Sequence, residues 1–213
     1  METKRIKKYF TVIPLQLRGE LAKVKYNSVD NPVLEYGETR FPIIPVIANT
    51  AECNDVIKVG VVLICQDGKE REEIKQNYQF FKDELEGLKT SGKVKDYEII
   101  EIKTEDDEKI ETQVQLLKDM MAEIGDDENL YSCVTYGTKP TPVVMMLALN
   151  YGYKIKHNTT VENVVYGRYD HAKPENSALY DITALFYANS IINRLGDMKV
   201  ENPDEALNNF LNF

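Results

Sequence analysis

Along the middle of the chain, segments with the apolar pattern of a strand alternate with segments with the apolar pattern of a helix. A nearly continuous β-branched run at 57–65 is typical of a strand buried on both faces of a parallel sheet. Apolar residues three and four positions apart follow at 74–88 and again at 110–124, which predicts two helices with one buried face each. A second β-rich run at 97–103 lies between them. This alternation predicts an α/β fold, with a mostly parallel sheet and helices on both faces.

The end of the chain follows the same plan. A strand is predicted at 163–169 and a last long helix at 182–195. Asp181 is expected to cap that helix, because a carboxylate is stabilised at a helix N-terminus. The tail at 198–213 is interpreted as a helical stub that begins at an Asn-Pro-Asp sequence. The preceding residues, 1–197, have the length of one α/β domain.

The first part of the chain is less regular. A first strand is predicted at 10–16, and the segment at 23–36 is interpreted as a small hairpin or an extended excursion with a turn-forming centre. Pro42 and Pro45 allow at most a short helix, which is expected to begin near the second proline. Farther along, residues 126–129 are predicted to form a loop.

Composition and charge narrow the classes of function. The net charge of −9 argues against a partner made of duplex nucleic acid, which needs a basic face. No apolar run approaches the ~20 residues that a membrane helix needs, and the basic N-terminus lacks a signal-peptide core. We therefore expect a cytoplasmic protein without a membrane partner. Three cysteines far apart and two histidines without ligand spacing lead us to expect no metal and no cofactor.

One loop combines the groups that suit an anion. A β-rich run from residue 130 ends in Thr-Tyr-Gly-Thr-Lys-Pro, and an apolar helix follows directly. Gly137 lets the backbone approach a ligand, while Thr135, Thr138 and Lys139 offer hydroxyls and one ammonium beside a helix start. Each of these side chains has a simpler interpretation, as a turn-forming threonine or a solvated lysine. Together they favour a site for a phosphate or phosphodiester.

Ligands of parallel sheets bind beyond the carboxyl ends of the strands, near the point where the strand order reverses. This rule selects three loops, at 16–19, 66–68 and 135–141. The middle one is a Gln-Asp-Gly turn that needs no ligand to explain it, so we do not expect it to contribute. His157 and His171 fall in polar loops and are expected to be exposed.

These features together resemble the CARF domains of CRISPR-associated proteins. The resemblance rests on Thr-Tyr-Gly-Thr-Lys-Pro with its helix, on a later Val-Val-Tyr-Gly strand, and on Tyr-Asp-Ile-Thr-Ala-Leu-Phe at 180–186. It covers roughly residues 8–196. The resemblance implies a Rossmann-like fold, a twofold homodimer and the binding of cyclic oligoadenylate, the second messenger of type III CRISPR systems in antiviral defence. In this family the ring lies across the dimer axis.

The resemblance also implies which residues bind the ring. They lie in the loop after the first strand and in the loop before the apolar helix: Gln16, Leu17, Arg18, Gly19, Thr135, Tyr136, Gly137, Thr138, Lys139 and Pro140. If the protein is a ring nuclease, the catalytic cations are Lys139 and Arg18, which would stabilise the attack of a ribose 2′-hydroxyl on the adjacent phosphate. If it is a sensor, it passes a ligand-driven change to an effector partner that the sequence does not identify.

Other classes of function stay open beside the CARF-like one. Many relatives have a glycine-rich first loop and a histidine and arginine in the second, which this chain lacks, so the ring size is open. Relatives usually carry a C-terminal effector, and no complete effector fits after residue 195. An ordinary Rossmann-type nucleotide-binding enzyme is disfavoured because no Gly-x-Gly-x-x-Gly follows a strand. A DNA-binding regulator is disfavoured by the acidic charge and by the absence of a helix-turn-helix pattern.

Overall fold

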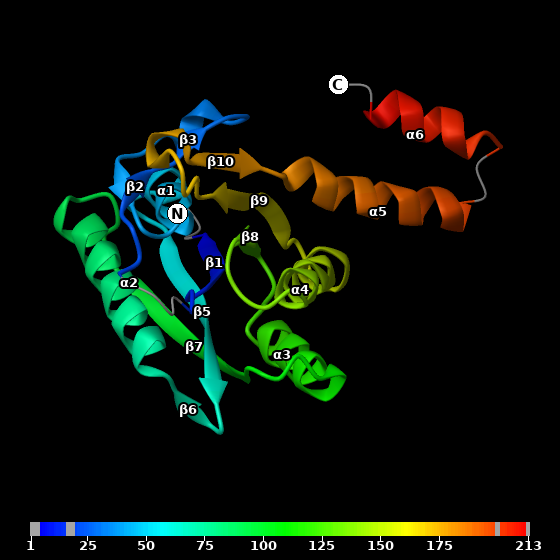
Figure 1. The fold of residues 1–213 in the computed structure, drawn as a ribbon. Coiled ribbons are helices and arrows are strands. Elements are labelled where there is room, and N and C mark those ends of the chain that lie inside the picture. The colour runs from blue at the N-terminus through cyan, green and yellow to red at the C-terminus, as the bar shows by residue number, and fades with distance from the viewer. Residues whose placement is uncertain (1–4, 16–19, 199–200, 212–213) are drawn as a thin grey trace.

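The computed structural model describes residues 5–15, 20–198 and 201–211, and it is built around one central sheet (Figure 1). Five strands run parallel in the spatial order β7, β5, β1, β8, β9. Their bounds are Ile6–Val12 (β1), Val56–Gln66 (β5), Tyr97–Glu105 (β7), Glu128–Cys133 (β8) and Thr160–Arg168 (β9). The chain builds outward from β1 to β7 and then returns to the other side of β1. The strand order therefore reverses between β1 and β8, as in a Rossmann-like fold.

Short strands extend this sheet. β10 pairs antiparallel with β9, β3 pairs with β10, and β6 folds back antiparallel on β5. β2 and β4 pair with each other in a separate two-stranded sheet. The bounds of these elements and of the two 3-10 turns are Val24–Lys25 (β2), Asn27–Ser28 (β3), Pro32–Leu34 (η1), Glu38–Thr39 (β4), Lys69–Glu70 (β6), Pro174–Asn176 (η2) and Ala178–Asp181 (β10).

Helices cover both faces of the sheet, as predicted. α1 and α2 lie on one face, and α3, α4 and the start of α5 lie on the other (Figure 1). The last helix, α6, packs against α5, and these two helices project from the body of the protein. The helix bounds are Ile43–Thr50 (α1), Glu72–Thr90 (α2), Ile110–Ala122 (α3), Thr141–Ile155 (α4), Thr183–Met198 (α5) and Pro203–Leu211 (α6).

The central strand β1 contributes to both hydrophobic cores, because successive side chains of a strand point to opposite faces. Tyr9 and Ile13 pack in the core under α1 and α2, whereas Phe10 and Val12 pack in the core under α3 and α4. All four side chains are completely buried. Gly60 of β5 makes room for one of them, since a Cβ there would lie 2.6 Å from the Phe10 ring. The packing of the whole sheet thus depends on β1.

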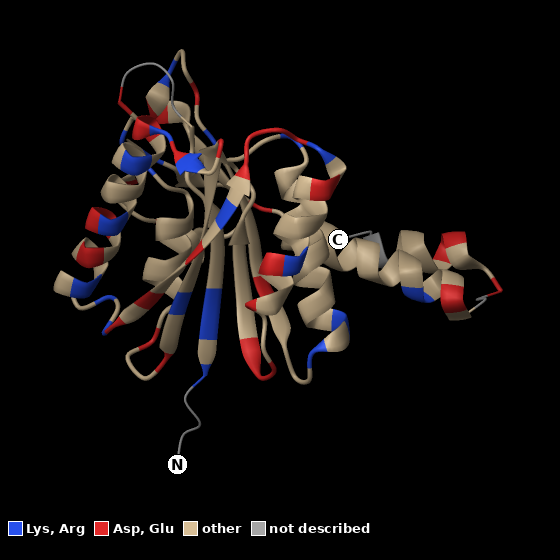
Figure 2. Ribbon diagram, turned by 90° about the horizontal axis from the view of Figure 1, so that it is seen from below, with Lys and Arg blue, Asp and Glu red and all other residues tan. Residues whose placement is uncertain are grey.

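Two lysines at the start of β1, Lys7 and Lys8, are buried and point to opposite faces of the sheet. Figure 2 shows Lys and Arg segments, in blue, within the strands of the sheet. Lys7 Nζ lies 2.8 Å from Asp55 Oδ2, and Lys8 Nζ lies 2.9 Å from Glu128 Oε1. None of these four side chains is more than 7% exposed. Glu128 also accepts the N–H of Gly125 at 3.0 Å. The charges at this end of the sheet are therefore neutralised inside the protein.

The predicted alternation of strands and helices is confirmed, but two boundaries are wrong. β1 runs from Ile6 to Val12 instead of 10–16, because Lys7 and Lys8 of the basic N-terminus are buried through their ion pairs. β8 begins at Glu128, inside the segment predicted as a loop at 126–129. The reason is the same, since Glu128 is the buried partner of one of these lysines.

The spacing of apolar residues did not predict the strand β10. The sequence pattern places residues 180–181 at the opening of the last helix, whereas in the structure they pair with Tyr166 and Val165 of β9. A strand of four residues is too short for a spacing pattern to identify. The expected role of Asp181 is confirmed, because its Oδ1 accepts the N–H of Thr183 at the start of α5, at 3.1 Å.

The excursion between β1 and β5 is extended, as predicted, but its pairing differs. Its first segment forms β2, which pairs with β4 at 38–39, while residues 32–34 form a 3-10 turn. α1 begins at Ile43, two residues before Pro45. A proline is tolerated in the first turn of a helix because its missing N–H would have no partner there. The start of α6 at Pro203 agrees with the predicted helical stub.

Candidate functional site

The reversal of strand order lies at the carboxyl edge of the sheet, between β1 and β8. These two strands pair directly, so the chain leaves them side by side, at 13–15 and at 134. The loop at 134–140 joins β8 to α4. The predicted ligand-binding residues of the loop after the first strand, Gln16, Leu17, Arg18 and Gly19, lie outside the described residues. The candidate site is therefore built from the 134–140 loop and the segments around it.

Thr135 fastens this loop to the neighbouring strand β9. Its Oγ1 accepts the N–H of Gly167 at 2.7 Å and lies 3.1 Å from Cys133 Sγ. Position 167 has no room for a side chain, because a Cβ there would lie 2.3 Å from Pro42 Cγ. The hydroxyl of Thr135 is thus engaged within the protein, where it positions the loop.

The turn before α4 depends on Gly137 and two threonines. The φ of Gly137 is +112°, and a Cβ at this position would lie 2.8 Å from Thr141 Cβ. A residue with a side chain would be strained there both by its backbone and by this contact. Thr138 Oγ1 lies 3.0 Å from Thr141 Oγ1, and the Thr138 carbonyl accepts the N–H of Thr141. These contacts close the turn onto α4.

The open backbone donors of the site lie in the turn, just before the helix. Within the described part of the chain, the N–H groups of residues 137–139 have no acceptor. In the first turn of α4, by contrast, the N–H groups of Val143 and Val144 both bond to the carbonyl of Pro140. Donors placed ahead of a helix still benefit from the positive end of its dipole. These donors lie two to four residues before Thr141, the first residue of α4.

Lys139 completes this open turn. Its side chain is exposed, and it forms no ion pair with any residue that the structure describes. An unpaired ammonium beside free N–H groups at a helix start is an arrangement that binds anions such as phosphate. The structure therefore brings Gly137, Thr138 and Lys139 together as a candidate anion site.

Tyr136 points the other way, into the protein. Its Oη donates a hydrogen bond to the Arg40 carbonyl at 2.9 Å. Burial raises the pKa of the Tyr136 phenol well above its ordinary value, and burial likewise raises the pKa of Tyr26, which lines the same pocket. Both phenols consequently stay neutral at physiological pH. Tyr136 links the exposed turn to this interior pocket.

The pocket beside Tyr136 has a volume of about 220 Å³. We call it the tyrosine pocket, and its lining consists of Glu20, Leu21, Ala22, Tyr26, Tyr136, Tyr169 and His171. The rings of Tyr169 and His171 stand nearly perpendicular, at 88°, with their centroids 4.7 Å apart. These rings come from the segment that follows β9, so the pocket lies at the same edge of the sheet as the 134–140 loop.

Asp170 fixes the turn that carries these two rings. Its Oδ1 accepts the N–H groups of Ala172 and Lys173, each at 3.0 Å, and its own N–H donates to Ser177 Oγ at 3.1 Å. The hydrogen bonds from the backbone N–H groups hold the pKa of Asp170 below its usual value. The aromatic wall of the tyrosine pocket is therefore part of an ordered turn.

Sequence reasoning missed Tyr169 and His171 as site residues. His171 is exposed, as predicted, but it shares a pocket with Tyr136. The signal was present, because both residues directly follow the parallel strand β9, and the rule about carboxyl ends applies to that strand too. The 66–68 turn has a structural explanation instead, since Gly68 donates to Glu105 and the chain folds back into β6.

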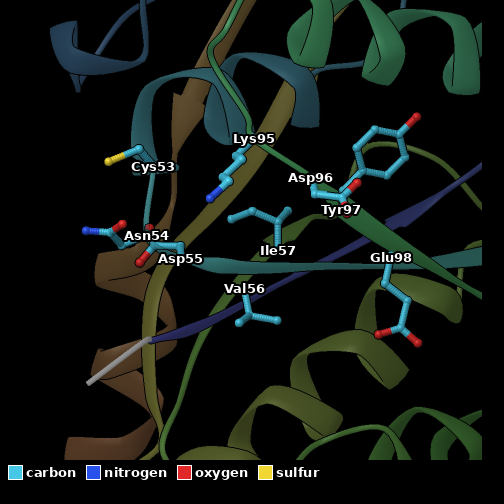
Figure 3. Close-up of a pocket in the computed structure, with 9 residues that line it drawn as sticks. All are labelled: Cys53, Asn54, Asp55, Val56, Ile57, Lys95, Asp96, Tyr97 and Glu98. Atoms are coloured by element: carbon cyan, nitrogen blue, oxygen red, sulfur yellow. The ribbon is translucent and has the colours of Figure 1, made fainter. Parts of the chain in front are cut away.

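A second hollow, of about 370 Å³, lies at the opposite edge of the sheet, where β5 and β7 begin (Figure 3). It is lined by residues 53–57 and 95–98. The carboxylates of Asp55, Asp96 and Glu98 are each paired with a lysine. Ligands of parallel sheets bind at the other edge, so this hollow is the weaker candidate despite its size.

No helix in the described ranges combines the length and the hydropathy that crossing a membrane requires. No protein-family model matches the sequence, and a search of curated proteins finds no match. What the chain binds is therefore inferred from its own residues and from their arrangement at the carboxyl edge of a Rossmann-like sheet.

Proposed function

We propose that the protein is a CARF-like domain that binds cyclic oligoadenylate, with the phosphates of the ring held by the 134–140 loop. The observation that carries this proposal is the open anion site, in which free N–H groups at 137–139 adjoin the unpaired ammonium of Lys139. It lies where the strand order of a Rossmann-like sheet reverses, which is the usual place for nucleotide ligands in such folds. The Thr-Tyr-Gly-Thr-Lys-Pro sequence of the same loop supports this choice of family.

The direct test is titration with cyclic tri-, tetra- and hexa-adenylate. At least one ring should bind at micromolar protein, and Lys139→Ala should weaken binding by about 1–3 kcal/mol, because a charge-assisted hydrogen bond is lost. Lys154→Ala is the matched control, since Lys154 is an exposed lysine near the other end of α4. Binding of none of the three rings would contradict the proposal, and unchanged affinity of Lys139→Ala would remove this lysine from the site.

The outer side of α4 supports a twofold homodimer that completes the site. Residues 141–153 include no Asp, Glu, Lys or Arg, and Val143 and Leu147 are 60% and 50% exposed. The neighbouring helix α3 exposes Ile110 and Val114. A surface helix normally has a charged outer face. In a twofold interface residues near the axis meet their own copies, so a charge-free face suits self-association in a chain of net charge −9.

Sedimentation measures this association. The wild type should sediment as a dimer, and Leu147→Glu should shift it toward monomer, because two carboxylates would face each other across the axis. Val33→Glu is the matched control, since Val33 is a similarly exposed apolar residue, at 65%, on a different element. A monomeric wild type, or a dimer that both variants leave intact, would remove α4 from the interface.

Incubation with the same rings also separates a nuclease from a sensor. As a ring nuclease, the protein would orient a ribose 2′-hydroxyl in line with the adjacent phosphate, and Lys139 would stabilise the negative charge of the transition state. The products are a cyclic 2′,3′-phosphate and a free 5′-hydroxyl, which chromatography resolves. Arg18, the other candidate cation, lies outside the described residues. Binding without these products would identify a sensor that acts through an effector.

A further inference from the structure

The tyrosine pocket differs in chemistry from the open turn beside it. Four of its lining residues are aromatic, namely Tyr26, Tyr136, Tyr169 and His171, and two are aliphatic. Its described lining includes no lysine or arginine, and its one acidic residue is Glu20. Such walls do not suit a phosphate. They suit a flat, uncharged ring with hydrogen-bonding groups at its edge.

The pocket and the anion site are close enough to hold two parts of one nucleotide. Tyr136 forms a wall of the pocket, and Lys139 follows it by three residues. Three residues span at most about 11 Å of extended chain, and the turn at Gly137 shortens this distance. A base in the pocket and a phosphate at the ammonium of Lys139 can therefore belong to the same ligand.

The two outer rings form a corner that suits a base. Tyr169 and His171 stand at 88° to each other, so a planar guest that stacks on one ring is perpendicular to the other. The imidazole can donate or accept a hydrogen bond, as can a phenol. Asp170 holds the turn between them through its bonds to two backbone N–H groups. Both stacking and recognition of the base edge are thus available in an ordered segment.

We infer that the tyrosine pocket receives one purine base of the bound ligand, with Tyr169 and His171 as its recognition residues. The inference rests on the proposed function, because that function supplies the phosphates next to the base. The aromatic walls nevertheless predict a behaviour of their own, which is the binding of a purine mononucleotide. Stacking favours any base, and hydrogen-bonding groups on His171 and on the phenols can meet its edge.

The test uses adenosine 5′-monophosphate, ribose 5-phosphate and the cyclic adenylates, with NMR and titration as readouts. The base protons of adenosine 5′-monophosphate should move upfield on binding, as stacking requires. Tyr169→Ala and His171→Ala should each weaken its binding about 5- to 150-fold, the usual range for one base contact, and leave ribose 5-phosphate binding unchanged. Lys139→Ala should weaken the binding of both compounds.

Tyr166→Ala and His157→Ala are matched controls. Tyr166 is on β9 but stacks on Tyr180 outside the pocket, and His157 is exposed in the loop before β9. Neither substitution should change the affinity for any of the compounds. Circular dichroism and thermal unfolding of all variants verify that each variant is folded, so that a loss of affinity does not result from unfolding.

The outcomes separate this inference from the proposed function. If a cyclic adenylate binds the wild type and Tyr169→Ala equally well, the base pocket is wrong and the proposed function stands. If no ring binds but adenosine 5′-monophosphate binds in a Tyr169-dependent manner, the pocket stands and the proposed ligand is wrong. If neither binds, both are wrong. Equal binding of ribose 5-phosphate and adenosine 5′-monophosphate would also overturn the base pocket.

Discussion

The lysines at the two edges of the parallel sheet differ in burial and in ion pairing. At the amino edge, Lys7 and Lys8 are buried and each lies within 3 Å of a carboxylate oxygen. At the carboxyl edge, Lys139 is exposed and unpaired among the described residues, beside backbone donors that have no acceptor there. The charges of Lys7 and Lys8 are therefore neutralised within the fold, whereas the charge of Lys139 is available to a ligand.

This difference follows from the cost of burying charge. A buried lysine keeps its charge only if a carboxylate and further acceptors replace its lost water, so its partners must be built into the fold. An exposed lysine keeps its water and contributes little to stability. Substitutions at the two edges should therefore separate stability from ligand binding.

Removal of Lys8 should have the largest effect. Lys8→Ala leaves the buried carboxylate of Glu128 without its partner, which costs about 3–5 kcal/mol in the free energy of unfolding. Urea denaturation measures this change. Lys139→Ala should change the same free energy by no more than about 0.5 kcal/mol, because it removes an exposed, unpaired side chain.

The matched control for this prediction is a double substitution. Lys8→Met with Glu128→Leu removes both charges and keeps apolar volume, so it should cost clearly less than Lys8→Ala alone. If the double variant is as unstable as the single one, the loss comes from packing and not from an unpaired charge. If Lys8→Ala is no less stable than Lys139→Ala, the contrast between the two edges is wrong.

The same contrast explains which parts of the fold could be predicted from the sequence. The strands at 57–65 and 97–103 and the helices after them follow from spacing, because burial on one or both faces leaves a periodic pattern. The start of β1 could not be predicted in this way. Its lysines are hydrophilic in any sequence scale, and only their distant partners, Asp55 and Glu128, show that they are buried.

The candidate site likewise has one part that could be predicted from the sequence and one part that could not. The turn at 135–140 is continuous in sequence, and its glycine, threonines and lysine could be recognised together. The tyrosine pocket could not, because Tyr26, Tyr136 and Tyr169 come from three separate segments. Spacing also cannot separate a ligand-facing threonine from a structural one, and the hydrogen bond from Gly167 to Thr135 is visible only in three dimensions.

Gly137→Ala should have the next largest effect, now at the carboxyl edge. The backbone at +112° and the Cβ contact with Thr141 should strain the turn by about 1–3 kcal/mol, either lowering stability or rearranging the loop. In both cases the affinity for the anionic ligand should fall. Gly87→Ala in α2 is the control, because a Cβ there meets no atom within 4 Å, and it should stabilise the helix slightly. Equal ligand affinity in Gly137→Ala and the wild type would show that the turn is not part of the site.

The smallest effect concerns Cys133, at the end of β8, and appears only at alkaline pH. Burial raises the pKa of this thiol to about 11 from an ordinary 9.0, although the contact with Thr135 opposes the shift. Because the folded state keeps the proton more tightly, stability that is fully present below pH 9 is lost as the pH rises toward 11. Buried tyrosines such as Tyr131 have raised pKa values too and add to this loss. Urea denaturation between pH 8 and pH 10 should therefore show a shallower decline for Cys133→Ala than for the wild type. Identical slopes would mean that the thiol beneath the 134–140 loop does not ionise with unfolding, and that the alkaline loss belongs to the tyrosines alone.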